Sequence, residues 1–270
     1  MDINFAYGFY HEGKLLYLDV DLNTSLKYYK ELKKALKIKN VKNYPLVRIG
    51  QQNRDGGYIM VNNFQLGGIA YSFGINNDVS WDNAMANLGY NIQMYDHTIN
   101  MLPYYIEGFY FHREGISGID QEDAPLKTLK YYINKNGHNK AKNMILKMDV
   151  EGAEWDFLET VDSRLLKKFD QITFEYHGLI QTKYKNKIIN QLKKLNKTHQ
   201  LVHLHGNNSG YMLKIHDVIF PNVMEATYVN KDKYEFVEND EIYLPIDIDM
   251  PNDAARSDII LGAWNKSFNI

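Results

Sequence analysis

The chain has 270 residues, of which 44% are hydrophobic and none is cysteine, and its formal net charge is −2. This length favours one large α/β domain, and the absence of cysteine excludes disulfides and cysteine-ligated metals. The near-neutral charge excludes a general nucleic-acid or anionic-membrane binder, and neither a membrane-length apolar stretch nor a signal pattern is found. We therefore expect a cytoplasmic protein that binds a small molecule and no nucleic acid or membrane. A homo-oligomer is compatible with these numbers.

The predicted elements alternate between helices and strands. A helix is expected over residues 21–38, where large apolar residues recur at helical spacing, and two strands around a Gly-Gly turn are expected over 45–61. Further strands are predicted at 69–75, 91–98, 109–117, 144–150, 171–179, 201–208 and 223–229, and further helices at 80–88, 125–135, directly after 150, and 184–195. This alternation predicts a mostly parallel sheet covered on both faces.

We expect a single domain with three parts. An N-terminal extension covers residues 1–66, a catalytic core covers 67–230, and an irregular tail that completes the site covers 231–270.

The most informative segment is KMDVEGAEWDFL, residues 147–158. An apolar run leads into Asp149, and the Glu-Gly-Ala-Glu sequence from Glu151 to Glu154 begins an amphipathic helix. Because ligands of open α/β sheets bind at the carboxyl ends of strands, Asp149 is a candidate catalytic and binding residue. The alternative is that Asp149 caps the helix, while Glu151 and Glu154 complement its dipole.

Two other strand ends resemble one half of a nucleotide site. Strand 69–75 ends at Gly74 and a polar loop that reaches Asp78, and the next strand ends at Asp96. An acid in that position can accept hydrogen bonds from both ribose hydroxyls of an adenosine, and the glycine permits close backbone approach. The GxGxxG pattern of a pyrophosphate cradle is absent, which favours S-adenosylmethionine. The alternative is an ordinary strand-turn-helix in which Asp96 caps a turn.

Titratable residues repeat at the ends of two later strands. Glu175 and His177 are two residues apart on one strand, and His203 and His205 repeat this spacing on the next. Each is a structural hydrogen-bonding group in the alternative interpretation. With Asp149 on a neighbouring strand they form a catalytic hypothesis with two versions. Either a carboxylate-backed histidine removes a proton from a substrate hydroxyl, or Asp149, Glu175 and His177 hold a divalent metal.

The Glu-Gly-Ala-Glu segment resembles the hallmark of the FkbM-type family of S-adenosylmethionine-dependent methyltransferases. A subgroup is matched by further segments between residues 47 and 252: VRIGQQNRDGGYIM, YSFGINNDVSWD, MYDHT, ITFEYH, VHLHGNN and LPIDIDMPN. The resemblance implies a class I methyltransferase (Rossmann-like) fold. This is a mostly parallel seven-stranded sheet with helices on both faces, here with an N-terminal helical and hairpin extension.

The resemblance also implies cofactor contacts. Gly74 would lie at the methionine and ribose, Asp96 at the ribose, and Gly115 with Ile116 at the adenine, while Arg48 and the segment 55–58 would cap the site. The loop after the first strand is less rich in glycine than is usual in the wider family. The candidate cofactor residues are Arg48, Gly57, Tyr58, Phe73, Gly74, Asp78, Asp96, His97, Gly115, Ile116 and Asp149.

Members of this family commonly methylate hydroxyls of sugars or other secondary metabolites. We therefore expect an O-methyltransferase acting on a nucleotide-linked or glycan sugar, in capsular or other surface-polysaccharide or secondary-metabolite biosynthesis. Asn207 and Asn208 are candidate hydrogen-bonding residues for such a substrate. The alternatives are a methyltransferase for a small amine or phosphoryl-linked acceptor, a nicotinamide-dependent oxidoreductase, and a binding module that has lost catalysis.

Overall fold

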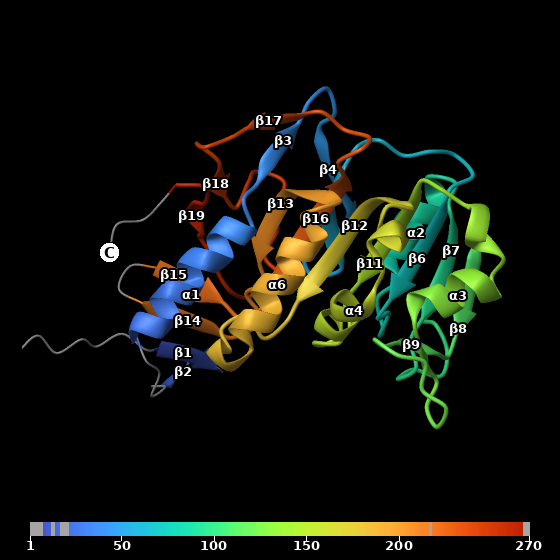
Figure 1. Cartoon of the computed structure of the whole chain (residues 1–270), viewed down its shortest axis with the longest axis horizontal. Helices are drawn as coiled ribbons and strands as arrows, with labels where there is room; N and C mark the ends of the chain where they lie inside the picture. The colour runs from blue at the N-terminus through green and yellow to red at the C-terminus, as the bar shows by residue number, and fades with distance from the viewer. Residues whose placement is uncertain (1–7, 12–13, 17–21, 216–217, 267–270) are drawn as a thin grey trace, which may run out of the picture.

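A seven-stranded sheet forms the centre of the computed structural model, which describes residues 8–11, 14–16, 22–215 and 218–266 (Figure 1). Its strands in chain order are β6 (Ile69–Phe73), β7 (Asn91–Tyr95), β8 (Phe109–His112), β11 (Met144–Met148), β12 (Phe169–Tyr176), β13 (His199–Gly206) and β16 (Met224–Asn230). They lie in the order β13-β16-β12-β11-β6-β7-β8. All neighbours from β8 to β12 are parallel, and β16 lies antiparallel between β12 and β13. The predicted mostly parallel sheet is confirmed.

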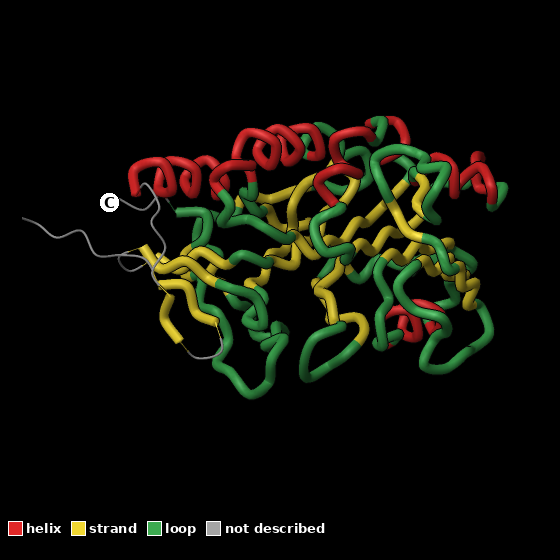
Figure 2. Tube along the Cα trace, turned by 90° about the horizontal axis from the view of Figure 1, so that it is seen from below, coloured by secondary structure: helices red, strands yellow, loops and turns green. Residues whose placement is uncertain are grey.

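Helices cover the two faces of the sheet unequally, as Figure 2 shows. Most helices lie along one face: α1 (Leu22–Ala35), α3 (Leu129–Lys135), α4 (Glu154–Thr160), α5 (Ser163–Leu166) and α6 (Lys185–Leu195). The opposite face is covered by α2 (Ser80–Asn87) and by a hairpin of β4 (Leu46–Gly50) and β5 (Gly57–Val61), which contact each other. None of the helices described is both long and apolar enough to span a membrane.

Alternate residues of the central strands supply two separate cores. On β11, Leu146 and Met148 pack with the large cluster that includes Leu32 of α1 and Leu192 of α6. Ile145 points the other way and belongs to the cluster that contains Trp81 and Met85 of α2. Because the period of a strand is two, this buried strand carries apolar residues on both sides, and Lys147 near its carboxyl end is its one charged residue.

The β4–β5 hairpin is attached to the sheet through polar side chains. The amide of Gln171 exchanges two hydrogen bonds with the backbone of Val61, and the hydroxyl of Thr227 donates to the Ile59 carbonyl at 2.6 Å. Buried polar groups require such partners. These bonds fix β5 across β12 and β16, which brings Tyr58 and the hairpin tip to the carboxyl edge of the sheet.

Smaller strands and two 3-10 turns complete the structure. They are β1 (Gly8–His11), β2 (Lys14–Leu16), β3 (Lys39–Val41), β9 (Gly115–Ile116), β10 (Leu126–Lys127), β14 (Met212–Ile215), β15 (Val218–Pro221), β17 (Phe236–Glu238), β18 (Tyr243–Leu244), β19 (Gly262–Ala263), η1 (His138–Lys140) and η2 (Thr182–Tyr184). The single strand predicted over 109–117 is therefore wrong, because the chain leaves the sheet after His112 and β9 pairs with β10 instead.

Candidate functional site

A cavity of about 400 Å³ lies at the carboxyl ends of β6, β7, β11 and β12. The predicted cofactor residues that line it are Tyr58, Phe73, Gly74, Asp78, Asp96, His97, Gly115, Ile116 and Asp149. Gly115 is required for close packing here, since a Cβ at this position would lie 2.5 Å from Nδ1 of His97. The strand ends that carry the predicted cofactor residues therefore meet around one cavity.

Arg48 and Gly57 are not among the residues that line this cavity. The Arg48 guanidinium donates to the carbonyls of Gln51 and Arg54, at 2.7 and 2.8 Å, and a Cβ on Gly57 would lie 2.0 Å from the Gln51 oxygen. Both residues thus build the turn of the β4–β5 hairpin. The tip of that hairpin, with Asp55, lines the cavity instead.

The loop after β6 touches the loop after β11. Gly74 has a φ of 78°, and a Cβ there would lie 1.6 Å from the Asp149 carbonyl oxygen. The Asp149 amide donates to the Phe73 carbonyl at 3.0 Å, and the Lys147 ammonium donates to the Gly74 carbonyl at 2.7 Å. Only glycine fits between these groups, so Gly74 fixes the distance between the two halves of the cavity.

Asp96 anchors the loop after β6. Its Oδ2 accepts hydrogen bonds from the amides of Ile75 and Asn76, and its Oδ1 accepts from the amide and hydroxyl of Thr98, all at 2.6–2.9 Å. Burial opposes ionisation, but these bonds hold the pKa of Asp96 below its ordinary value. Asp96 therefore remains charged and shapes the cavity wall, and its contact with a ribose remains a prediction.

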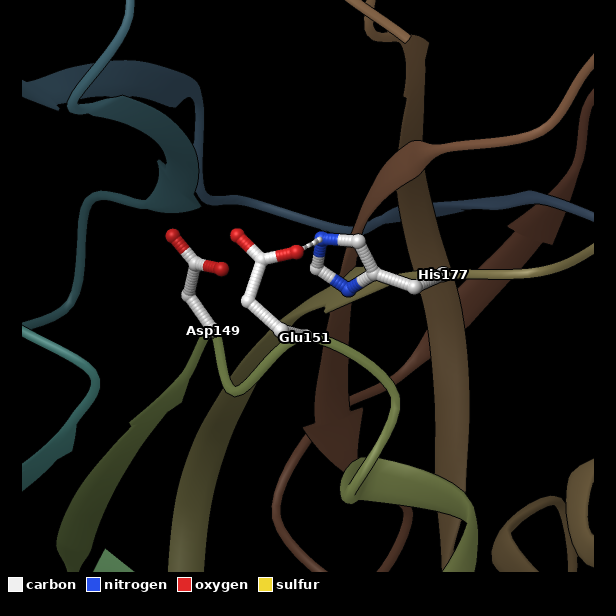
Figure 3. A group of neighbouring side chains, drawn as sticks. All are labelled: Asp149, Glu151 and His177. Atoms are coloured by element: carbon white, nitrogen blue, oxygen red, sulfur yellow. Dashed lines mark ion pairs between the residues drawn. The ribbon is translucent and has the colours of Figure 1, made fainter. Parts of the chain in front are cut away.

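Asp149, Glu151 and His177 converge beside this loop (Figure 3). Nε2 of His177 lies 3.4 Å from Oε2 of Glu151, and ligand atoms from all three residues lie within 4.8 Å of one another. The Tyr58 hydroxyl donates to Oδ2 of Asp149 at 3.4 Å. Burial raises the pKa of Asp149, although the nearby charges of Lys147 and His177 oppose the rise.

His177 is surrounded by carboxylates. Its backbone amide donates to Oε1 of the fully buried Glu154 at 2.6 Å, and its ring nitrogens lie 3.3 Å from Oε1 of Glu154 and from Oε1 of Glu175. Burial lowers the pKa of this imidazole, but the two carboxylates outweigh it and raise the pKa to about 11. In this environment His177 is protonated at neutral pH, so a carboxylate is better placed than the imidazole to accept a proton.

Glu175 has one engaged and one unengaged oxygen. The residue is 7% exposed, and Oε2 has no hydrogen-bond partner among the described residues. Burial, and then repulsion from Asp149, raises its pKa to about 8. Its oxygens also lie within 4.8 Å of those of Asp55 and Glu225, and the Asn252 amide donates to both of these carboxylates.

The structure does not bring the other predicted site residues to this cavity. His203 lies 3.1 Å from Asp249, and His205 lies between Glu225 and Asp258, at 3.3 and 3.0 Å. The cavity lining contains none of the four residues predicted for catalysis or substrate binding on and after β13: His203, His205, Asn207 and Asn208.

The amide groups of these two asparagines are used within the protein. Asn208 donates to the carbonyls of Asp253, Arg256 and Ser257 and accepts from the Asp253 amide, while Asn207 accepts from the Ser209 amide. The polar residues on β13 and directly after it thus hold the C-terminal tail against the sheet. Buried polar groups on a strand can serve in this way to pair with a neighbouring segment.

Several residues of the site were not predicted as members of it. Lys147 shows a recognisable signal, because a lysine two residues before Asp149 on a buried strand points to the same side. Glu151 and Gly152 have φ values of 54° and 107°, so α4 begins at Glu154 and not directly after the strand as predicted. This turn directs Glu151 towards His177, which spacing alone does not predict.

Residues 60–201 match the family model of the methyltransferase FkbM domain. The matched segment runs from β5 to β13 and contains Gly74, Asp96, Asp149, Glu175 and His177. No curated protein sequence matches the chain.

Proposed function

The chain belongs to the FkbM methyltransferase family, since the family model covers more than half of it, and we propose that it methylates a hydroxyl group of a sugar. Methyltransferases of this family use S-adenosylmethionine in general. We infer a class I methyltransferase fold from the family and the strand order together. The acceptor sugar would be linked to a nucleotide or to a glycan, in the biosynthesis of a capsular or other surface polysaccharide or of a secondary metabolite.

One observation supports this proposal: one end of the cavity has the residues that suit an adenosine, and the other end has carboxylates that can accept a proton. Gly74 and Asp96 lie at the first end, and Asp149 and Glu175 lie at the second. The described lining holds several carboxylates against a single lysine: Asp55, Asp78, Asp96, Asp149, Glu151, Glu175 and Lys147. This excess of negative charge suits a cofactor whose reactive centre is a sulfonium cation.

Glu175 is the proposed proton acceptor. The sulfonium supplies an activated methyl group, so the protein has to align the acceptor oxygen and remove its proton. The acceptor oxygen bonds to the methyl carbon as the carbon–sulfur bond breaks, the sulfur keeps the electron pair, and the hydroxyl proton passes to Oε2 of Glu175. Because His177 contacts Oε1, the carboxylate is held with Oε2 unpartnered. A neutral amine needs no such base, which favours a hydroxyl acceptor.

A divalent cation is the second part of this proposal. The residues that would hold it are Asp149, Glu151 and His177, whose ligand atoms lie within 4.8 Å, and Glu151 here takes the place that the sequence suggested for Glu175. The two carboxylates suit Mn²⁺ or Mg²⁺, and the ion would displace the proton that His177 otherwise carries, because only a neutral imidazole binds a metal. Such an ion would lower the pKa of a bound hydroxyl.

Removal of this cation is expected to lower the rate of methyl transfer at least tenfold, because the hydroxyl loses its Lewis acid. Activity should be measured after prolonged chelation and again after addition of Mn²⁺ or Mg²⁺. Glu151→Gln should need more metal for half-maximal activity, whereas Glu159→Gln, an exposed acid on α4, should not. Full activity in chelated protein with no metal by elemental analysis would eliminate the metal and leave Glu175 as the sole proton acceptor.

The function itself is tested by incubating the protein with S-adenosylmethionine and four acceptor classes: nucleotide sugars, free sugars, small amines and phenols. Mass spectrometry should find a mass gain of one methyl group on a sugar. Turnover of amines or phenols alone would reject the sugar acceptor and leave the family assignment unchanged.

The cofactor end is tested at Asp96. Asp96→Ala should weaken S-adenosylmethionine binding by about tenfold to a hundredfold, because a charged acceptor for two ribose hydroxyls is lost. Calorimetry measures this affinity. Glu107→Ala, an exposed acid in the loop between β7 and β8 that does not line the cavity, serves as the comparison and should bind the cofactor like the wild type. Unchanged affinity in Asp96→Ala would remove Asp96 from the cofactor site.

A further inference from the structure

A second cavity, of about 370 Å³, adjoins the first. It lies between the loops that follow β11 and β12 and the start of α6, and its lining includes Trp155, Asp156, Gln181, Tyr184 and Lys187. Glu151 and Gly152 belong to its lining as well, and Glu151 also lines the first cavity. The second cavity thus begins where the candidate reacting group lies.

His177 forms part of the boundary. It lines the second cavity, and its ring lies within 3.4 Å of both Glu151 and Glu175, which line the first. A molecule in the second cavity therefore meets the same carboxylate–imidazole group as a molecule in the first, but from the other side of Glu151. A methyl donor and its acceptor need this relation, because transfer requires the two molecules to meet end to end across the reacting centre.

The lining has an aromatic part. The indole of Trp155 stacks on Tyr176, with ring centroids 4.8 Å apart, and its Nε1 donates to the His177 carbonyl at 2.7 Å, so the ring is fixed. Trp155 is 7% exposed, so the exposed aromatic ring of the lining is that of Tyr184, a residue that is 48% exposed and whose ring centroid lies 4.7 Å from the Lys183 ammonium. Sugar rings have an apolar face of C–H groups that packs against aromatic rings, whose polar ends remain free for hydrogen bonds.

The charged groups of the lining nearly cancel. The Lys187 ammonium pairs with Asp156 and also lies 3.0 Å from Glu159. Glu151 lies against His177. Because the lysine is already neutralised, the described lining offers no spare cation for a phosphate, while Gln181 adds an amide that can both donate and accept. This inventory favours an uncharged polyhydroxylated ring.

We propose that the second cavity binds the sugar ring of the acceptor and directs one hydroxyl past the Glu151 side chain, which is 87% exposed, into direct contact with the methyl group in the first cavity. This inference rests on the proposed function. It adds that the sugar ring of the acceptor binds in the second cavity and that this ring is uncharged. A nucleotide or glycan attached to that sugar would lie outside the second cavity.

The test compares Tyr184→Ala and Gln181→Ala with Tyr110→Ala. Tyr110, on β8, is 49% exposed and lines neither cavity, so it controls for the loss of an exposed ring. Binding of a panel of methyl hexopyranosides should be measured by ligand-observed NMR with S-adenosylhomocysteine present, which requires no turnover. For the hexopyranoside that the wild type binds best, Tyr184→Ala should raise the dissociation constant at least tenfold and Gln181→Ala at least threefold. Tyr110→Ala should match the wild type, and all variants should keep their affinity for S-adenosylhomocysteine.

Three results would overturn the inference. The first is that the wild type binds no hexopyranoside, and the second is that both variants bind like Tyr110→Ala. The third is that Asp55→Asn, at the opposite rim of the first cavity, weakens sugar binding while Tyr184→Ala does not. Binding that follows the expected order without any methyl transfer would instead reject the proposed function and leave the sugar site standing.

Discussion

Glu175→Gln is expected to lower kcat by about 10²–10⁴-fold, the range that a positioned general base contributes. The amide keeps the shape of the side chain and its contact with His177 but cannot accept the hydroxyl proton. The affinity for S-adenosylmethionine should stay within about threefold, because Glu175 faces the reacting end. Single-turnover kinetics and calorimetry on the same preparations separate the two effects.

The pH profile of the wild type provides a second measure of this role. A base must be deprotonated, and burial raises the pKa of Glu175 to about 8. The rate should therefore rise with pH and level off above that region, whereas an ordinary carboxylate would already be ionised at pH 6. A rate that is independent of pH from 6 to 9 would contradict this assignment.

Glu225→Gln is the matched control for the kcat measurement. Glu225 pairs directly with Glu175 across β12 and β16 and is also buried, at 3% exposure against 7%, but it does not line the cavity. Its kcat should remain within about threefold of the wild type at a temperature where circular dichroism shows both variants folded. An equal loss of kcat in both variants would mean that Glu175 acts only through the buried charge network.

Gly74→Ala should prevent the cavity from forming. The new Cβ would meet the Asp149 carbonyl oxygen at 1.6 Å, and the φ of 78° is unfavourable for alanine. Strain and overpacking together should lower the free energy of unfolding by about 2–5 kcal/mol and should abolish measurable cofactor binding. Chemical denaturation and calorimetry measure the two consequences.

Gly137→Ala separates these two causes. Gly137 has a φ of 74°, but a Cβ there meets nothing within 4 Å, so only the backbone strain applies, at about 1–2 kcal/mol. The excess loss in Gly74→Ala then measures the contact with Asp149. If both variants lost the same free energy of unfolding and cofactor affinity were preserved, the loops after β6 and β11 could move apart at no cost in free energy.

The sequence predicts the central sheet well because hydrophobic periodicity is a local signal. The apolar run that ends at Met148 and the alternation on β11 identify a buried strand without any knowledge of its neighbours. The direction of β16 is not local information. The chain connects β13 to β16 through β14 and β15 without a helix, and such a connection returns antiparallel.

The candidate site is predicted in part for the same reason. Strand ends are recognisable from the sequence, and the strand-end residues Gly74, Asp96 and Asp149 do line the cavity. The carboxylate that a histidine will contact cannot be predicted from the spacing of residues along the sequence. His203 and His205 have the same pattern as Glu175 and His177, but their carboxylate partners Asp249 and Asp258 lie in the tail, more than forty residues away. Only the folded chain shows that Glu175 lines the first cavity and His177 the second, whereas His203 and His205 fasten the tail.

The position of β16 has a consequence for the ribosome-bound chain. Within the central sheet β13 is hydrogen-bonded to β16 alone, and β16 also covers the free edge of β12. Until Met224–Asn230 has been synthesised, two strands expose unpaired backbone groups, and exposed edges of this kind recruit other chains. The last strand of the sheet therefore closes both exposed edges during synthesis, and its arrival also places Glu225 beside Glu175.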